Sequence, residues 1–419
     1  MSTPPLNDDD AIAPRRTGFV VPLLLMLLVQ ALTSSASQAI PVLATEAADS
    51  FGVREDRVGF FVSASYFVAM LGALFGGTYA ARYGAIRVSQ VALGLCAAGL
   101  LIFTVGSAWI LLPAAIVLGL AYGPATPASS QILARLTPAR LMNVVFSIKQ
   151  TGVPLGGIIA GSIVAPLVVF AGWQWAAAAL AGACLAMAAL LQPLRARLDL
   201  ETAAARPTLK QLFGPLKLLW GMAELRRLST LSIAFSAIQV SLSTYLVIFV
   251  LDRTGAGLIA AGLALTATQI AGVAGRVFWG SVADWTQRPR LVLALLGLAM
   301  AAAAAATACV DASWPQEALI ALLVVFGATA IGWNGVFLAE VARTAGPAKA
   351  GELTGATAVF TFAGPLLGPS LFGLILLLTG SYAVAFGVMG GFTLVSGLLL
   401  FRDARNEHAI LRQRIDSAL

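Results

Sequence analysis

The chain has 419 residues, of which 59% are hydrophobic and 11% are charged, with a net charge of +7 and a mean hydropathy of +0.89. Soluble domains carry about 25% charged residues, so this composition excludes a soluble domain and indicates a polytopic membrane protein. The basic excess is therefore expected to set membrane topology rather than to bind nucleic acid. The single histidine, His408, lies in the C-terminal tail, which excludes a histidine-based metal site within the membrane.

Apolar segments long enough to cross a bilayer occur in two groups of six, on either side of a polar interval. They span residues 18–43, 57–81, 86–106, 109–134, 141–170, 173–194, 228–251, 258–283, 291–310, 318–341, 353–378 and 382–401. A cleaved signal peptide is the alternative for the first segment, but its length of about 26 residues favours a membrane helix. We expect an all-α integral membrane fold with a tail at 1–17, six-helix bundles at 18–194 and 228–401, a loop at 195–227 and a tail at 402–419.

Basic residues gather at one set of segment ends, the set that includes both termini and the middle loop. The opposite ends carry only Arg54, Arg57 and Arg253, and two further cations, Lys149 and Arg276, lie deep within segments. The positive-inside rule therefore predicts a bacterial inner-membrane protein with both termini and the loop 195–227 in the cytoplasm. Within that loop, LFGPLKLLWGMAEL is expected to be a tether, with an interfacial helix of regulatory function as the alternative. Both tails are predicted to be solvated or disordered.

The two deep cations are the strongest functional signal in the sequence. By helix rise, Arg276 is roughly 12 Å from the membrane edge marked by Asp284, and Lys149 is roughly 13 Å from the edge marked by Arg140. A guanidinium at that depth costs at least ~2.5–3.5 kcal/mol to insert, so it is expected to face a partner or a water-filled cavity. An ion pair with a carboxylate, or snorkelling of either side chain to the membrane surface, is the alternative.

No carboxylate is predicted at the same depth. The deepest acids on the terminal side, Glu340 and Glu352, lie within three residues of Arg343 and Lys349 and look interfacial. Two unpaired cations favour an anionic ligand, because arginine offers a bidentate fork for a carboxylate and lysine a compact point charge. No phosphate-binding loop, metal cluster or nucleophile–base pair appears, so we expect neither enzyme activity nor a cofactor.

The two halves of the chain repeat. The motif GTYAARYGAIR at 77–87 corresponds to GSVADWTQRPR at 280–290. The motif GVPLGG at 152–157 corresponds to GPLLGP at 364–369. These motifs resemble the major facilitator superfamily over nearly the whole chain, which implies two bundles related by a pseudo-twofold axis that rock about a central site. Ala81 occupies a position where that family usually has an acidic residue. Its absence predicts that the cytoplasmic gating contacts of the first half are weakened. The resemblance implies gating roles for Gly77, Arg82, Gly84, Gly280, Asp284, Gly152, Pro154, Gly364 and Pro365.

The resemblance also implies that the fifth and eighth helices, which carry Lys149 and Arg276, face each other. Trp333 and Phe337 share a face of the tenth helix, with Asn334 beside them. An arginine in helix eight with an aromatic pair in helix ten is similar to the oxalate/formate antiporter and monocarboxylate carrier branch. That branch has a second cation in helix eleven, which is absent here, so we expect Lys149 to replace it. Ordinary helix packing is the alternative interpretation of the aromatic pair.

Five further polar side chains in the segments are candidates for ligand contact or for helix–helix hydrogen bonds. They are Gln30, Gln38, Tyr66, Gln150 and Gln269. We expect a monomeric carrier that moves a small mono- or dicarboxylate, exchanged for another anion or accompanied by a proton. The alternatives are an exporter of drugs or amphiphiles with the same fold and a membrane sensor that binds ligand without transport.

Overall fold

The computed structural model describes residues 18–54, 57–138, 141–199, 209–346 and 349–416, and these ranges are helical, without strands. Twelve spans in them are long and apolar enough to cross a membrane, as predicted. The predicted N-terminal tail at 1–17 lies outside the described residues. The first six spans are formed by α1 (Val20–Phe51), α2 (Val58–Tyr83), α3 (Ala85–Phe103), α4 (Ala108–Leu136), α5 (Met142–Gln150), α6 (Gly152–Ile159), the π-helical turn η4 (Ala160–Val164), α7 (Ala165–Ala171), α8 (Trp173–Leu190) and α9 (Gln192–Leu198).

The second half begins with a helix in the connecting loop, α10 (Leu209–Gly221). The last six spans are α11 (Ala223–Thr254), α12 (Leu258–Thr286), α13 (Pro289–Ala308), α14 (Gln316–Ala330) with α15 (Asn334–Ala345), α16 (Ala350–Thr379) and α17 (Tyr382–Asp416). The fifth and tenth spans, predicted as continuous helices, are each broken near the middle. At these breaks Arg276 donates hydrogen bonds to the main-chain oxygens of Gln150 and Ile331.

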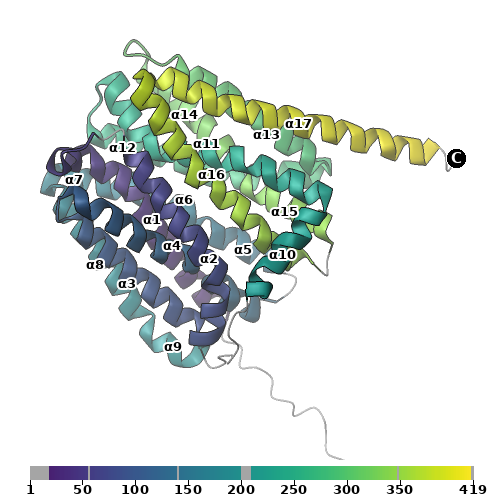
Figure 1. Cartoon of the computed structure of the whole chain (residues 1–419), viewed down its shortest axis with the longest axis horizontal. Coiled ribbons are helices and arrows are strands. Elements are labelled where there is room, and N and C mark those ends of the chain that lie inside the picture. The colour runs from purple at the N-terminus through teal and green to yellow at the C-terminus, as the bar shows by residue number, and fades with distance from the viewer. Residues whose placement is uncertain (1–17, 55–56, 139–140, 200–208, 347–348, 417–419) are drawn as a thin grey trace, which may run out of the picture.

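Three helix pairings repeat between the halves and give the fold its pseudo-symmetry. In the first half α2 packs on α4, α3 on α8, and α1 on α6; in the second half α12 packs on α14, α13 on α17, and α11 on α16. These are spans 2–4, 3–6 and 1–5 followed by 8–10, 9–12 and 7–11. Figure 1 shows the two groups side by side, with α1 to α9 on one side and α11 to α17 on the other.

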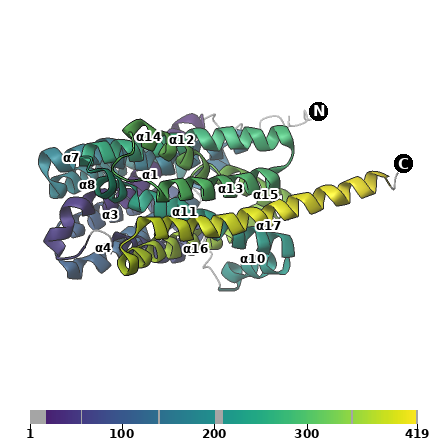
Figure 2. The ribbon, with the colours of Figure 1, turned by 90° about the horizontal axis from the view of Figure 1, so that it is seen from above.

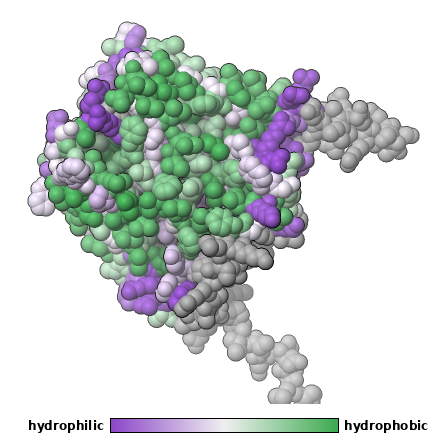
Figure 3. Space-filling model, in the orientation of Figure 1, coloured by the Kyte–Doolittle hydropathy of each residue, from purple (hydrophilic) through white to green (hydrophobic). Residues whose placement is uncertain are grey.

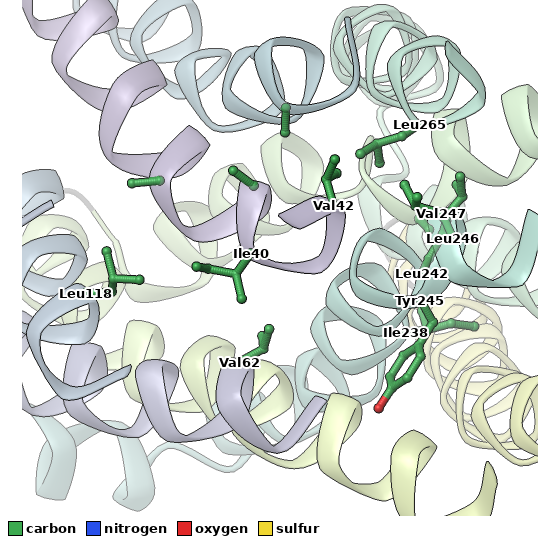
Figure 4. Packing of buried hydrophobic residues seen from close by; sticks show 14 of the residues in the cluster. Ile40, Val42, Val62, Leu118, Ile238, Leu242, Tyr245, Leu246, Val247 and Leu265 are labelled. Carbon is green, nitrogen blue, oxygen red and sulfur yellow. The ribbon is translucent and has the colours of Figure 1, made fainter. Parts of the chain in front are cut away.

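The surface is organised as a membrane protein requires. Figure 3 shows hydrophobic residues across the middle of the face in view and hydrophilic residues gathered at its two ends. Large apolar side chains such as Phe170, Trp175 and Val277 are exposed, because lipid rather than water is their natural surroundings. The buried residues form one core cluster shared by both halves, and Figure 4 shows Ile40, Val62 and Leu242 within it.

The C-terminal tail from Arg402, predicted to be solvated or disordered, is helical. Helix α17 continues without a break to Asp416 and extends beyond the rest of the molecule (Figures 1 and 2). Polar residues follow the last apolar turn, so hydropathy marked the end of the span but not the end of the helix. In the connecting loop, α10 packs on α16, with the rings of Trp220 and Phe360 stacked at 6.0 Å.

Asp199 brings a carboxylate to the loop between the second and third spans, where Ala81 replaces the acidic residue that is usual in similar proteins. Its two carboxylate oxygens accept hydrogen bonds from the backbone N–H groups of Ile86 and Arg87, at 3.0 Å each. A carboxylate at this place satisfies orphan donors at the N-terminus of α3 and complements the helix dipole. Gly84 is required beside it, because its φ is +90° and a Cβ there would collide with the Asp199 side chain.

Replacing Asp199 with alanine should lower the free energy of unfolding by about 0.5–2 kcal/mol, the usual cost of losing an N-terminal helix cap. Asp284, at the equivalent loop of the second half, is exposed and its carboxylate accepts no hydrogen bond within the described chain. Asp284→Ala is therefore the matched control and should unfold at the wild-type temperature. Thermal unfolding in detergent measures both, and equal melting temperatures for the two variants would contradict the capping role.

Candidate functional site

Arg276 lies at the interface of the two bundles and bonds to both of them. Its Nη1 donates to the main-chain oxygen of Gln150 at 2.8 Å, and its Nε donates to the main-chain oxygen of Ile331 at 3.1 Å. Gln150 ends α5 in the first bundle, and Ile331 follows α14 in the second. The partially negative carbonyl ends of two interrupted helices thus offset part of the cost of burying the guanidinium.

Proline explains why the Gln150 carbonyl is available. In a continuous helix it would accept a hydrogen bond from the N–H of the residue four positions later, but that residue is Pro154, which has no N–H. The same logic holds in the eleventh span, where the carbonyl of Pro365 faces Pro369 and instead accepts a bond from Ser63 Oγ at 3.4 Å. In both motifs a proline exposes a carbonyl that a side chain from the opposite bundle binds.

Lys149 is 1% exposed and precedes Gln150 in α5. Its Nζ donates to the main-chain oxygen of Thr126 at 3.3 Å, to Ser130 Oγ at 3.5 Å and to Gln150 Oε1 at 3.5 Å. All three acceptors are neutral and the bonds are long. In the described part of the chain, neither Lys149 nor Arg276 forms an ion pair with a carboxylate, so the ion-pair alternative finds no support there.

Gln30 shares the partner Thr126 with Lys149. It is 1% exposed, and its Oε1 accepts a hydrogen bond from Thr126 Oγ1 at 3.0 Å. Its amide nitrogen is buried without a partner among the described residues. Thr126 therefore connects the buried ammonium of Lys149 to Gln30, whose amide nitrogen is an unused donor among the described residues, and such surroundings favour an anion.

A cavity of about 40 Å³ lies between the bundles beside Arg276. Gln38, Tyr66 and Gln269, three of the predicted polar residues, line it, and so does Ile331, whose carbonyl Arg276 binds. Gln269 Nε2 donates to Gln38 Oε1 at 2.8 Å, which joins α12 to α1 across the interface. The cavity holds a few waters but is smaller than an organic anion. A substrate must therefore enter with some separation of the bundles.

The aromatic pair of the tenth span lies inside the second bundle. Trp333 and Phe337 are 0% and 2% exposed, their ring centroids are 5.2 Å apart, and Trp333 packs edge-on against Phe235 at 5.5 Å. Trp333 Nε1 and Asn334 Nδ2 both donate to Gln239 Oε1, at 2.9 and 3.1 Å. Gln239 lines the cavity. Trp333 and Asn334 therefore position Gln239, and direct contact of Trp333, Asn334 and Phe337 with substrate stays a prediction.

The glycines of the two glycine–proline motifs lie at equivalent close approaches. A Cβ on Gly152 would lie 2.8 Å from the Gln30 side chain in α1, and a Cβ on Gly364 would collide with Ser236 in α11. Pro154 and Pro365 follow them within α6 and α16. Among the loop residues, Arg82 lies over the Tyr83 ring and a Cβ on Gly280 would meet open space. The surroundings of Gly77, within α2, are outside the described part of the chain.

Contacts between the bundles gather in the half of the molecule away from the termini. There α2 packs on α16, and α12 packs on η4 with the backbones of Gly161 and Gly262 in contact. Replacing Gly161 with valine should force these helices apart, because its Cβ would collide with the Gly262 carbonyl. Cross-linking of Ser63→Cys with Ser370→Cys, which join α2 to α16, should then fall severalfold.

Gly182→Val is the matched control for this prediction, since a Cβ there meets nothing within 4 Å. It should leave the cross-linking yield unchanged. Undiminished cross-linking in the Gly161→Val protein would contradict the inference that this glycine contact holds the far side closed.

Three residues of this region were not anticipated. Gln239 and Tyr122 bond to or lie beside predicted residues, and Asp199 caps a distant helix. Tyr122 is close enough to Arg276 for an electrostatic interaction. Gln239 had the signal by which the other glutamines were selected, a polar side chain within an apolar span. Tyr122 carried the same signal as Tyr66, a polar side chain within an apolar span, whereas Asp199 carried none, because its role depends on which helices become neighbours.

Two pseudo-symmetric bundles of membrane-spanning helices, with a buried cation and a cavity between them, define a membrane carrier. The sequence matches the Major Facilitator Superfamily over residues 23–369, and the chain belongs to this family of transporters. It is therefore a transporter rather than an enzyme.

Similar proteins support this assignment. The chain is 25% identical over 283 residues to an uncharacterized MFS-type transporter of Mycobacterium tuberculosis, matched in two strains. That alignment covers 66% of this chain, and the chain spans 61% of the length of those relatives. The crystal structure of a POT family transporter in complex with 5-aminolevulinic acid matches with a TM-score of 0.72 at 13% identity, over 93% of this chain and 98% of that one. At this identity, the likeness concerns the fold alone.

Proposed function

We propose that this transporter moves a small organic anion, a mono- or dicarboxylate, and binds it between Arg276 and Lys149. The observation that carries the proposal is that both cations reach the same residue, Gln150, from opposite bundles and without a carboxylate among the described residues. Backbone carbonyls and neutral side chains are their hydrogen-bond partners in this structure. A carboxylate is a stronger acceptor for both, because hydrogen bonds between charged groups are about twice as strong as neutral ones.

The same geometry suggests how binding drives alternating access. Arg276 belongs to the second bundle and Lys149 to the first. An anion bound between them would therefore link the two bundles, on the side of the cavity where both chain termini lie. The free energy gained by binding the anion must exceed the loss of the Arg276 bond to Gln150, which links the bundles in this conformation. Exchange for a second anion or co-transport of a proton would complete the cycle. The narrower relationship to the oxalate/formate antiporter and monocarboxylate carrier branch is part of this proposal.

The proposed orientation places both termini in the cytoplasm of a bacterial cell, with the chain in the inner membrane and acting as a monomer. The distribution of basic residues supports it. In this orientation the contacts of α2 with α16 and of α12 with η4 close the periplasmic side. Substrate in this conformation would exchange with the cytoplasm.

Ligand-dependent thermal stabilisation of the purified transporter tests this function. Formate, acetate, oxalate, succinate and benzoate serve as anionic probes, and tetraphenylphosphonium as a cationic amphiphile. Stabilisation by at least one carboxylate is expected. Stabilisation by the amphiphile alone would favour the rival function, an exporter of drugs or amphiphiles.

Lys149→Gln should weaken carboxylate binding roughly tenfold or more, because one charge-assisted hydrogen bond contributes about 1.5–3 kcal/mol. Lys149→Arg keeps the charge and separates its loss from a change in side-chain shape. We expect the arginine variant to retain more of the carboxylate-dependent shift in melting temperature than the glutamine variant. Equal shifts in the wild type and Lys149→Gln would remove Lys149 from the site.

A further inference from the structure

Three aromatic rings from three helices meet beside the central cation. Tyr66 of α2 and Tyr122 of α4 pack edge to face with centroids 5.6 Å apart, and Phe362 of α16 lies 6.1 Å from Tyr66 and 6.4 Å from Tyr122. The group therefore spans both bundles. We call these three residues the aromatic group.

Two separate observations place the aromatic group next to the proposed anion site. Tyr66 lines the same cavity as Ile331, whose carbonyl accepts the Nε bond of Arg276. Tyr122 is close enough to Arg276 for an electrostatic interaction, and its ring packs edge to face against Tyr66. Tyr122 therefore lies near Arg276, and Tyr66 lines the cavity.

The rings are incompletely packed, unlike other aromatic side chains nearby. Tyr66, Tyr122 and Phe362 are all half-buried, although they lie between the bundles. By contrast Trp333 and Tyr245 are 0% exposed. Aromatic surface left open beside a buried cation fits a ligand with an apolar, planar body and one carboxylate. Aromatic rings attract one another in edge-to-face and offset geometries by about 0.5–1.5 kcal/mol beyond the effect of buried area.

From this arrangement we propose that the substrate is an aromatic carboxylate, with its carboxylate on Arg276 and its ring held by Tyr66, Tyr122 and Phe362. The inference rests on the proposed function and narrows it, because a short aliphatic acid would leave the aromatic group without a ligand. The tyrosine hydroxyl groups add a polar edge, so a ring bearing a hydroxyl substituent also fits.

Equilibrium binding to the purified full-length protein tests the inference, with benzoate, cyclohexanecarboxylate, acetate and succinate as probes. Benzoate should bind at least tenfold more tightly than acetate. It should also bind about two- to tenfold more tightly than cyclohexanecarboxylate, which has similar size without an aromatic face. Tyr122→Leu and Phe362→Leu should reduce the ratio of benzoate to acetate affinity at least fivefold. Tyr122→Phe, which keeps the ring, should preserve most of that ratio.

Tyr79→Leu is the control, since Tyr79 is 44% exposed on α2 and lies outside the aromatic group. If acetate or succinate bind in an Arg276-dependent way and benzoate binds no better, the aromatic inference is overturned and the proposed function stands. If benzoate preference survives both leucine substitutions, the aromatic group does not hold the ring and the inference is overturned as well. If no carboxylate binds, the proposed function fails with it.

Discussion

Replacement of Arg276 by glutamine should abolish measurable carboxylate binding. Removing one partner of a buried, hydrogen-bonded charge pair costs about 2–5 kcal/mol, which corresponds to a loss of affinity on the order of a hundredfold or more. Isothermal titration calorimetry measures this loss of affinity, with the carboxylate of the panel that the wild type binds most tightly. Arg276→Lys should retain part of the affinity, because it keeps the charge but loses the bidentate fork.

Arg276 also holds the carbonyls of Gln150 and Ile331, so its replacement has a structural cost that must be separated from the loss of binding. The melting temperature without ligand measures that cost. Lys217→Gln is the matched control, because Lys217 is exposed on α10. Wild-type affinity in a folded Arg276→Gln protein would show that the anion binds elsewhere.

The largest effect on stability is expected at Glu340. Its side chain is 0% exposed and lies between Arg290 Nε at 2.6 Å and Arg343 Nε at 2.7 Å, at the terminal side of the second bundle. Arg290 also bonds to Glu224 at 2.7 Å, which ties α11, α13 and α15 together. Glu340→Gln removes the buried one of the two carboxylates paired with Arg290, which is itself only 18% exposed. Such a change destabilises proteins by about 3–5 kcal/mol.

Glu224→Gln is the control for this second prediction. The Glu224 side chain is 66% exposed, and exposed ion pairs contribute about 0–1 kcal/mol. Thermal unfolding of the two variants should therefore differ clearly, with Glu340→Gln much the less stable. Similar melting temperatures would mean that the buried pair contributes no more than the exposed one.

Hydropathy and repeats were sufficient to predict the fold. A lipid-exposed helix must be apolar over its whole length, so each span is visible as a run of sequence. The repeat of GVPLGG and GPLLGP marked the symmetry-related fifth and eleventh spans, which the structure places at equivalent contacts with α1 and α11. What hydropathy could not mark was the end of α17, because a helix that leaves the membrane continues on local propensity alone.

The candidate site was only partly visible in the sequence. Arg276 and Lys149 stand out because an isolated charge in an apolar run is costly. Gln150 was selected as a polar side chain, but the role of its main-chain carbonyl could not be predicted, because that carbonyl is left free by Pro154 and reached only through the approach of α12 to α5. Glu340 was expected to be interfacial because it lies within three residues of Arg343; the structure pairs it with Arg343 and also with Arg290, which is 50 positions away. Contacts of this kind come from tertiary packing.

Transport itself is the most direct test of the central claim, that Arg276 binds the carboxylate of a transported anion. Uptake of radiolabelled acetate, succinate and benzoate into proteoliposomes should be saturable with the wild-type protein and with Lys217→Gln. Uptake by Arg276→Gln should fall to the level of protein-free liposomes. Undiminished uptake by Arg276→Gln, or transport of a cationic amphiphile with no transport of any carboxylate, would contradict the account.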